Sequence, residues 1–372
     1  MRGGQSVWGK GVVQIPCGNP SLTRRVVGDM NKLLLTAAFL TLPLAAAQTT
    51  APVSAAAPVS AAAPAKPAAP ARLLLTSPVG TAAEYVMTTR VSMKMSTPTV
   101  EALPGGKVSQ AELDQIRQAM QAGGTQAIPV QTVTSKVFYR VMARDAAGKT
   151  TLLNAVVLPA MDGKKANTIR TTQTVDADGK TELLKVESDD PQTQAALAAV
   201  KGEMLKLVQQ QNDQQPSVQY GAPLVVGKTD TRTVSMNMQN LLGGLLGAMG
   251  SGPGGEQLIQ KVQSSPLAAT IATTYTGLNP QGLHSFTTTM SYQPWQVRIE
   301  GKGDMPTIQI EVLSGKTSGT QLYRPDGLPS SSDMNIDMNM TMTTEMQGVR
   351  VRLGMDMTQQ IQMVLKQSQV VK

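Results

Sequence analysis

The sequence predicts an α+β protein built on a mainly antiparallel, long-stranded curved sheet, half-barrel-like in shape, with a few covering helices. Apolar and polar residues alternate over long segments, turn signals separate these segments, and only two segments carry the start and stop signals of helices. Two arrangements stay open: a single large curved sheet, or two duplicated β-rich lobes at 76–226 and 227–372.

The first 75 residues are not expected to belong to the folded part. A positive start at Met30, an apolar run at 33–44 and small residues at 45–47 predict a signal peptide over residues 30–47. Residues 1–29 are then a mis-called start; a cytoplasmic extension ahead of a signal anchor is the alternative. The Ala/Pro-rich segment 48–75 reads as an extended linker.

Composition narrows the compartment and the partners. Cys17, the only cysteine, precedes the signal peptide, so the mature chain has no disulfide, thiol nucleophile or cysteine-ligated metal. Removing residues 1–47 leaves 28 basic and 24 acidic residues, a net charge of +4 in place of +8. We expect a periplasmic or secreted protein, with no nucleic-acid partner and no transmembrane span.

The first lobe is expected to begin with an alternating strand over 85–95, rich in methionine. Ser109 and Glu112 form a capping box that predicts a helix to about Ala122. A second helix is expected from Gln192 to about Gln211, after Asp190-Pro191. Further strands are predicted near 131–144, 150–158, 167–176 and 180–188.

The second lobe begins near Gly227, and its first strand contains Val234-Ser-Met-Asn-Met238. This segment resembles Val91-Ser-Met-Lys-Met95 of the first lobe, which suggests duplication. Later strands are predicted near 268–276, 284–292, 295–301, 307–313 and 319–324.

The strongest signal is a terminal hairpin at 333–365. Apolar residues occupy the even positions from Met334 to Met346, and the phase flips after Gln347-Gly348. The hairpin therefore has one methionine-lined face, with Met340 inside and Asn339 toward solvent.

A resemblance follows from three short motifs, listed here: Tyr85-Val-Met-Thr-Thr89 running into Met93-Lys-Met95, Val226-Gly-Lys228, and Gly327-Leu-Pro329 before Met338-Asn-Met-Thr-Met342. They are similar to exported bacterial β-rich proteins of unknown function with Met-x-Met strands in two halves. Over most of residues 80–365 the pattern is also distantly similar in kind to the lipoprotein-carrier half-barrels of the LolA and LolB type. No binding motif of those carriers can be matched to residues of this chain.

Known catalytic constellations are not predicted. His284 is the only histidine, it lies in an alternating stretch, and a sheet-face residue is the simpler interpretation. Asp176-Ala-Asp178-Gly179 resembles part of a calcium loop but is better explained as a hairpin turn. We therefore expect no enzyme, no cofactor and no metal.

The methionines are the best candidates for function. They could line a core or pocket, bind Cu(I), or scavenge oxidants; the first interpretation is favoured because the mature chain has only nine aromatic residues. The candidate ligand-lining residues are Met334, Met338, Met340, Met342, Met355, Met357, Leu242 and Leu245.

Leu242 and Leu245 lie in a Gly-loosened apolar segment, 241–249. This segment is expected to be a lid, a membrane-touching element, or a helix and loop packed on the sheet. The expected function is non-enzymatic: an exported envelope protein that binds an apolar or lipid-like ligand on a concave, methionine-lined sheet. The alternative is a structural or interaction protein of the cell envelope with no small ligand, whose partner is another envelope protein.

Overall fold

A computed structural model describes residues 71–122, 128–160, 166–191, 193–195, 197–198, 201–202, 205, 220–237, 239, 242–243, 259–302 and 306–371. The expected start at 1–29, signal peptide at 30–47 and most of the linker lie outside these residues, so they stay predictions. No helix in the described ranges is long and apolar enough to cross a membrane.

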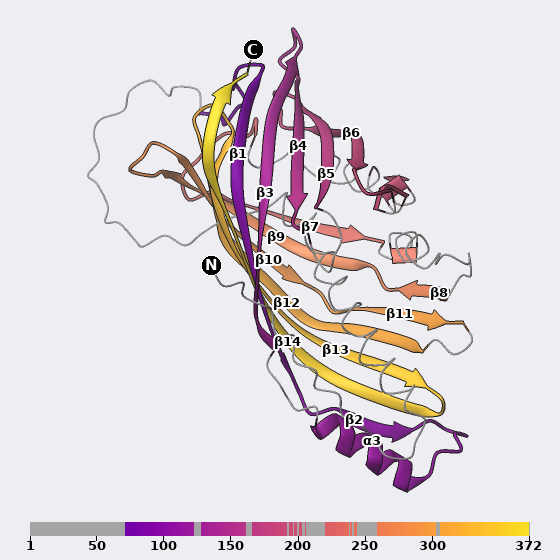
Figure 1. The fold of residues 1–372 in the computed structure, drawn as a ribbon. Helices are drawn as coiled ribbons and strands as arrows, with labels where there is room; N and C mark the ends of the chain where they lie inside the picture. The colour runs from indigo at the N-terminus through magenta and orange to yellow at the C-terminus, as the bar shows by residue number, and fades with distance from the viewer. Residues whose placement is uncertain are drawn as a thin grey trace, which may run out of the picture.

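The described chain is dominated by one curved, antiparallel sheet that does not close, as the sequence predicted (Figure 1). Its strands are β1 (Thr81–Met95), β2 (Thr99–Ala102), β3 (Ile128–Arg144), β4 (Thr150–Leu158), β5 (Asn167–Val175), β6 (Thr181–Ser188), β7 (Thr229–Met236), β8 (Ile259–Ser264), β9 (Leu267–Leu278), β10 (His284–Tyr292), β11 (Trp295–Gly301), β12 (Thr307–Tyr323), β13 (Pro329–Met346) and β14 (Val349–Val370).

The strand order joins the two predicted lobes into one sheet. The main path runs β6-β5-β4-β3-β1-β14-β13-β12-β10-β9-β7, so the first strand of the chain pairs with the last. The first lobe supplies one half of the sheet, the second lobe supplies the other, and β6 and β7 are the edges. In Figure 1 the strands of the first half run across the direction of β9 to β13. Duplication stays a prediction.

The terminal hairpin is confirmed and is longer than predicted. Strands β13 and β14 pair from Met346 opposite Val349 outward. Gln347 and Gly348 both have positive φ, 49° and 82°. These values fit the two-residue turn that continues the right-handed twist of the strands, and glycine adopts such a φ without strain.

The prediction of separate strands at 307–313 and 319–324 was wrong, because β12 runs unbroken from Thr307 to Tyr323. Gly315, which lies between the two predicted ranges, has a packing role within the strand. A Cβ on Gly315 would lie 2.8 Å from the ring of Tyr292, so the missing side chain makes room for that ring. The two ends of β12 pair with different strands on this side: β11 at one end and β10 at the other. Strand β11 in turn pairs with β8.

The predicted first helix is present as α3 (Gln110–Ala122), beside β2. Its capping box is formed: the Ser109 backbone N–H donates to Glu112 Oε2 at 2.8 Å, and the Glu112 N–H donates back to Ser109 Oγ at 3.3 Å. The Ser109 N–H and the Ser109 hydroxyl, which both donate to Glu112 Oε2, hold the pKa of that carboxyl below its usual value. Most of the described residues between 191 and 205 are helical too, within the second predicted helix.

The two faces of the sheet differ in chemistry. One, here called the core face, carries the apolar phase of each strand; the other, the polar face, carries the alternate residues. Met340 is 9% exposed on the core face, whereas Asn339 is exposed on the polar face, so the predicted facing of the hairpin is confirmed. The main core cluster takes side chains from both halves, including Tyr85, Val141 and Ile336.

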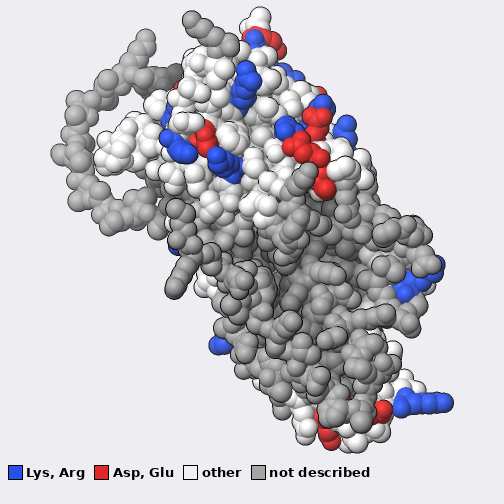
Figure 2. Space-filling model, viewed as in Figure 1, with Lys and Arg blue, Asp and Glu red and all other residues white. Residues whose placement is uncertain are grey.

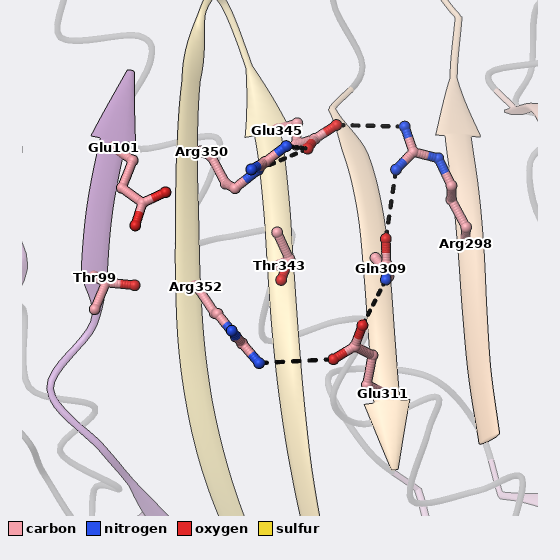
Figure 3. Close-up of a pocket in the computed structure, with 9 residues that line it drawn as sticks. All are labelled: Thr99, Glu101, Arg298, Gln309, Glu311, Thr343, Glu345, Arg350 and Arg352. Carbon is pink, nitrogen blue, oxygen red and sulfur yellow. Dashed lines mark hydrogen bonds and ion pairs between the residues drawn. The ribbon is translucent and has the colours of Figure 1, made fainter. Parts of the chain in front are cut away.

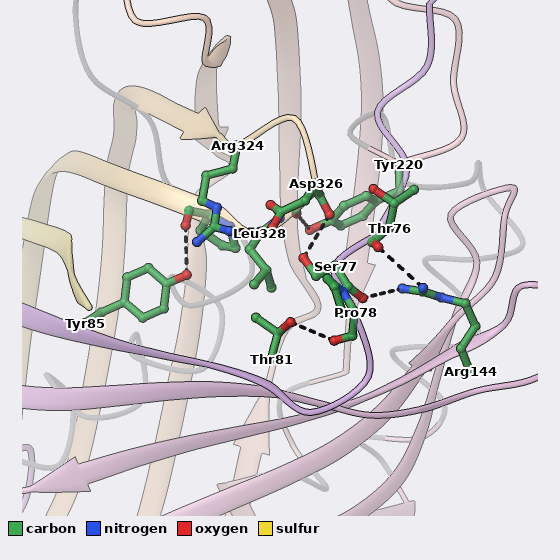
Figure 4. Close-up of polar contacts among 12 residues, drawn as sticks. Thr76, Ser77, Pro78, Thr81, Tyr85, Arg144, Tyr220, Arg324, Asp326 and Leu328 are labelled. Carbon is green, nitrogen blue, oxygen red and sulfur yellow. Dashed lines mark hydrogen bonds and ion pairs between the residues drawn. The ribbon is translucent and has the colours of Figure 1, made fainter. Parts of the chain in front are cut away.

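One end of the core face is tied down by residues 71–78, here called the strap (Figure 4). Leu73 is fully buried against Phe286 and Tyr323, and Leu75 belongs to the main core cluster. The prediction that the extended linker reaches residue 75 was therefore wrong for residues 71–75, because Leu73 and Leu75 pack into the core. The guanidinium of Arg144, from β3, donates to the carbonyl oxygens of Leu75 at 2.9 Å and of Ser77 at 2.7 Å.

The β12–β13 turn holds the other side of the strap. The backbone N–H groups of Thr76 and Ser77 donate to the carbonyl oxygen of Asp326 at 2.9 and 3.1 Å. Tyr85 donates its hydroxyl proton to the Pro329 carbonyl at 2.8 Å. The strap therefore connects both halves of the sheet at this end.

Candidate functional site

Six methionines form two cross-strand rows on the core face. The rows are Met93, Met357 and Met338, and Met95, Met355 and Met340, on β1, β14 and β13 in each case. Directly opposite residues point to the same side of an antiparallel sheet, so the six thioether side chains lie together. Their long strands place them at fixed spacing, while each side chain keeps its own freedom of rotation.

Burial in this methionine cluster is uneven. Met340, Met355 and Met357 are 3–9% exposed, whereas Met338 and Met95 are only half-buried. Val312, Ile308 and Trp295 pack around the cluster from β11 and β12. The half-buried members are the places where another apolar molecule could touch the cluster.

The structure brings most of the candidate ligand-lining residues to one face. Met338, Met340, Met342, Met355 and Met357 belong to or pack against the methionine cluster. Met334 lies further along β13 in the core cluster that contains Tyr85, and Met338 packs against both clusters.

Leu242 is buried in a neighbouring cluster with Val297 and Ile299. Trp295 packs against this cluster and against the methionine cluster, so Leu242 adjoins the methionines through the indole ring. Leu242 and Gly243 are helical. Leu245 and the rest of the predicted lid lie outside the described residues, so the lid stays a prediction.

An open pocket of about 270 Å³ lies on the polar face, near the hairpin turn (Figure 3). It is lined by Thr99, Glu101, Arg298, Gln309, Glu311, Thr343, Glu345, Arg350 and Arg352. Arg350 and Arg298 contact Glu345 at 2.7 and 3.3 Å, and Arg352 lies 3.8 Å from Glu311. These are partly exposed cross-strand ion pairs, each worth ~0–1 kcal/mol, which connect the four strands β11, β12, β13 and β14.

Sequence reasoning missed this network, although a signal was present. A two-residue turn at 347–348 places Glu345 opposite Arg350, and Thr343 opposite Arg352. Figure 2 shows acidic and basic side chains interspersed over the described part of the visible surface.

His284 and the Asp176 loop lie where the sequence placed them. His284 begins β10, and its Nδ1 lies 3.1 Å from the hydroxyl of Tyr275; burial lowers the pKa of the imidazole. Asp176 makes the β5–β6 turn, and its side chain accepts from the backbone N–H groups of Asp178 and Lys180 at 3.0 and 2.8 Å. Within the described ranges, no group of three or more His, Cys, Asp or Glu residues could hold a metal ion.

Comparison with known proteins does not assign the chain to a family. No family model matches the chain, and no curated protein matches its sequence.

Proposed function

We propose that this chain is an exported envelope protein that binds an apolar or lipid-like ligand on the core face of its open sheet. The observation that carries the proposal is the methionine cluster: six thioethers in two rows, with Met338 and Met95 only half-buried. Methionine is unbranched and polarizable, so a surface made of it can adapt to acyl chains or other irregular apolar groups.

The architecture also favours a ligand. The edges β6 and β7 are not paired with each other, so strand pairing does not close the core face into a barrel. The aromatic side chains gather at the strap end, where Tyr85, Tyr220, Phe286 and Tyr323 pack with Leu73 and its neighbours. At the opposite end the methionine cluster dominates, with Trp295 packed beside it. This asymmetry fits a sheet that is fixed at one end and adaptable at the other.

The proposed compartment rests on the sequence. The predicted signal peptide at 30–47 and the cysteine-free mature chain support export to the periplasm or beyond. N-terminal sequencing of the mature protein is the check: a chain beginning at Gln48 supports export, and a chain retaining residues 1–29 contradicts it.

The alternative, a structural or interaction protein of the envelope, is favoured by one observation. Most of the cluster is already buried: Met355 is 3% exposed and Met357 is 5% exposed. A core of this kind needs no ligand to exclude water. A ligand-binding protein should carry a bound apolar molecule and take up an apolar dye, whereas a structural protein should do neither.

Native mass spectrometry of the protein purified from its own envelope tests for a carried ligand, and uptake of an environment-sensitive apolar dye by the delipidated protein tests the face. Met338→Asn should reduce dye uptake severalfold, because Met338 is the half-buried centre of the face. Met142→Asn is the matched control, since Met142 is 45% exposed on β3. Equal dye uptake by both variants, or no dye uptake by the wild type, would contradict ligand binding at this face and favour the structural function.

A further inference from the structure

Arg232 is a charged side chain at the edge of the core face. It lies on the edge strand β7, directly opposite Ile271 of β9. The same cross-strand row continues through Met290, Thr317, Ile336 and Gln359. Ile271 and these four residues are each 1–3% exposed. Because opposite residues share a side of the sheet, the Arg232 side chain belongs to the core face and not to the polar one.

The guanidinium of Arg232 lacks an anionic partner among the described residues. Its Nε is buried and has no hydrogen-bond acceptor, and no described carboxylate forms an ion pair with it. The neighbouring acid on the same side of β7, Asp230, is engaged by Lys228 at 3.2 Å. Burial lowers the pKa of Arg232, with no opposing charge to raise it.

Arg232 is half-buried, and its Nε is a buried donor without an acceptor. A guanidinium keeps its charge in proteins, and a donor that is taken out of water without a partner loses a hydrogen bond without compensation. The arginines of the polar face show the contrast: Arg298, Arg350 and Arg352 each lie within 4.0 Å of a carboxylate. Arg232 lies among apolar neighbours instead, beside Val234 on its own strand and Ile271 on the next.

We infer that Arg232 binds the acidic head group of the ligand, and that the ligand is an anionic acyl amphiphile with a carboxylate or phosphate head. This inference rests on the proposed function and specifies its ligand class. The planar, forked donors of arginine suit bidentate contact with either head group. The half-buried apolar residues of the neighbouring cross-strand row, Val234 and Tyr292, suit the acyl chain, and they lie on the same face as the charge.

The path from the head-group site to the methionines follows the neighbouring cross-strand row. It passes through Val234, Ala269, Tyr292, Gly315 and Met338. Four strand spacings separate β7 from β13 along this row, or about 19 Å. Tyr292 packs against both the Leu242 cluster and the Ile271 cluster, so the row is continuous with the residues around Trp295.

Fluorescence quenching by brominated acyl chains tests the inference, because Trp295 packs against the methionine cluster. Trp295 is the sole tryptophan of the proposed mature chain from Gln48, and Trp8→Phe makes it the sole tryptophan of the full 372-residue chain. The delipidated protein is titrated with 9,10-dibromostearate, with the corresponding brominated alcohol, and with a lysophosphatidate bearing the same brominated chain. The acid and phosphate arms identify the preferred head group, and the alcohol measures the contribution of the chain alone.

Arg232→Gln should weaken binding of the preferred anionic ligand at least tenfold and change alcohol binding by less than twofold. Arg232→Lys loses the forked guanidinium donors but keeps the positive charge. It should therefore bind the anionic ligand more tightly than Arg232→Gln does. Arg90→Gln is the matched control on the polar face, where Arg90 contacts Gln360 at 3.4 Å; it should leave all three ligands unchanged. The melting temperature of Arg232→Gln should not fall, because no partner is lost.

Two results would overturn the head-group site while leaving apolar binding intact. One is an Arg232→Gln protein that loses acid and alcohol binding equally. The other is one that binds the anionic ligands as the wild type does. Failure of the wild type to bind any of the three chains would instead remove the proposed function and this inference together.

Discussion

Met340 and Thr132 differ in burial, and this difference should determine how much an introduced carboxylate destabilises the fold. Met340 is 9% exposed and packs in the methionine cluster, whereas Thr132 is exposed on the polar face opposite Arg90. Met340→Asp should lower the free energy of unfolding by ~3–5 kcal/mol, because it buries an unpaired carboxylate. Thr132→Asp should change it by less than about 0.5 kcal/mol. Urea unfolding of both variants measures the difference, and equal midpoints would contradict the facing.

The buried tyrosines predict loss of stability in alkali. Burial raises the pKa of Tyr139 to about 12 and those of Tyr85, Tyr220 and Tyr323 further. Unfolded tyrosines ionise near pH 10, so above that pH the folded state binds more protons and stability falls as pH rises. The contribution is complete below pH 10 and is lost as pH rises toward the folded-state values.

Tyrosinate absorbance and circular dichroism, recorded together during an alkaline titration, measure this effect. The buried phenols should ionise together with unfolding, and exposed phenols of the denatured chain in urea provide the reference. Ionisation of all tyrosines near pH 10 with the sheet intact would contradict their burial.

At the scale of elements, the strap should contribute more to the stability of the fold than its eight residues suggest. Leu73 is fully buried in the aromatic cluster, while its neighbour Leu74 is 39% exposed. Leu73→Ala should cost ~2–5 kcal/mol, through lost burial and the cavity left behind. Leu74→Ala, with the same chemistry one residue away, should cost well under half of that. Thermal melts compare the two, and equal melting temperatures would show that the strap is not fixed to the core.

The elements differ in how far the sequence could predict them. The hairpin was predictable because alternation and a two-residue turn are local signals. Strand β12 was read as two strands, because Gly315 serves Tyr292 on another strand and not a turn. Strand β8 and strand β2 were missed: each is short and is held by neighbours distant in the chain.

At the scale of the whole molecule, one sheet implies one cooperative unit. The pairing of β1 with β14 joins the halves along the full length of β1, and the main core cluster takes side chains from both. Denaturant unfolding should therefore show coincident transitions by Trp295 fluorescence, which reports the second half, and by far-ultraviolet circular dichroism, which reports all strands. Two separated transitions would support independent lobes at 76–226 and 227–372.

The candidate site was predictable in part, for a reason that belongs to the whole fold. Alternation alone identified the methionines of the hairpin. It could not join them to Met93 or to Arg232, because these contacts depend on which strands are neighbours. That order is set by pairings between residues far apart in the chain, such as Met93 with Met357. In the sequence Arg232 is simply one more polar residue in an alternating strand.

The strap also determines how the molecule bears a pull. Tension that arrives along the chain at Ala71 enters the sheet through residues 71–78. Before β1 carries any load, the carbonyls of Ala71 and Leu73 must separate from the N–H groups of Leu224 and Gly221, at 2.8 and 2.9 Å, and Leu73 must leave its aromatic cluster. We therefore expect mechanical failure to begin at the strap, before force reaches the central seam between β1 and β14.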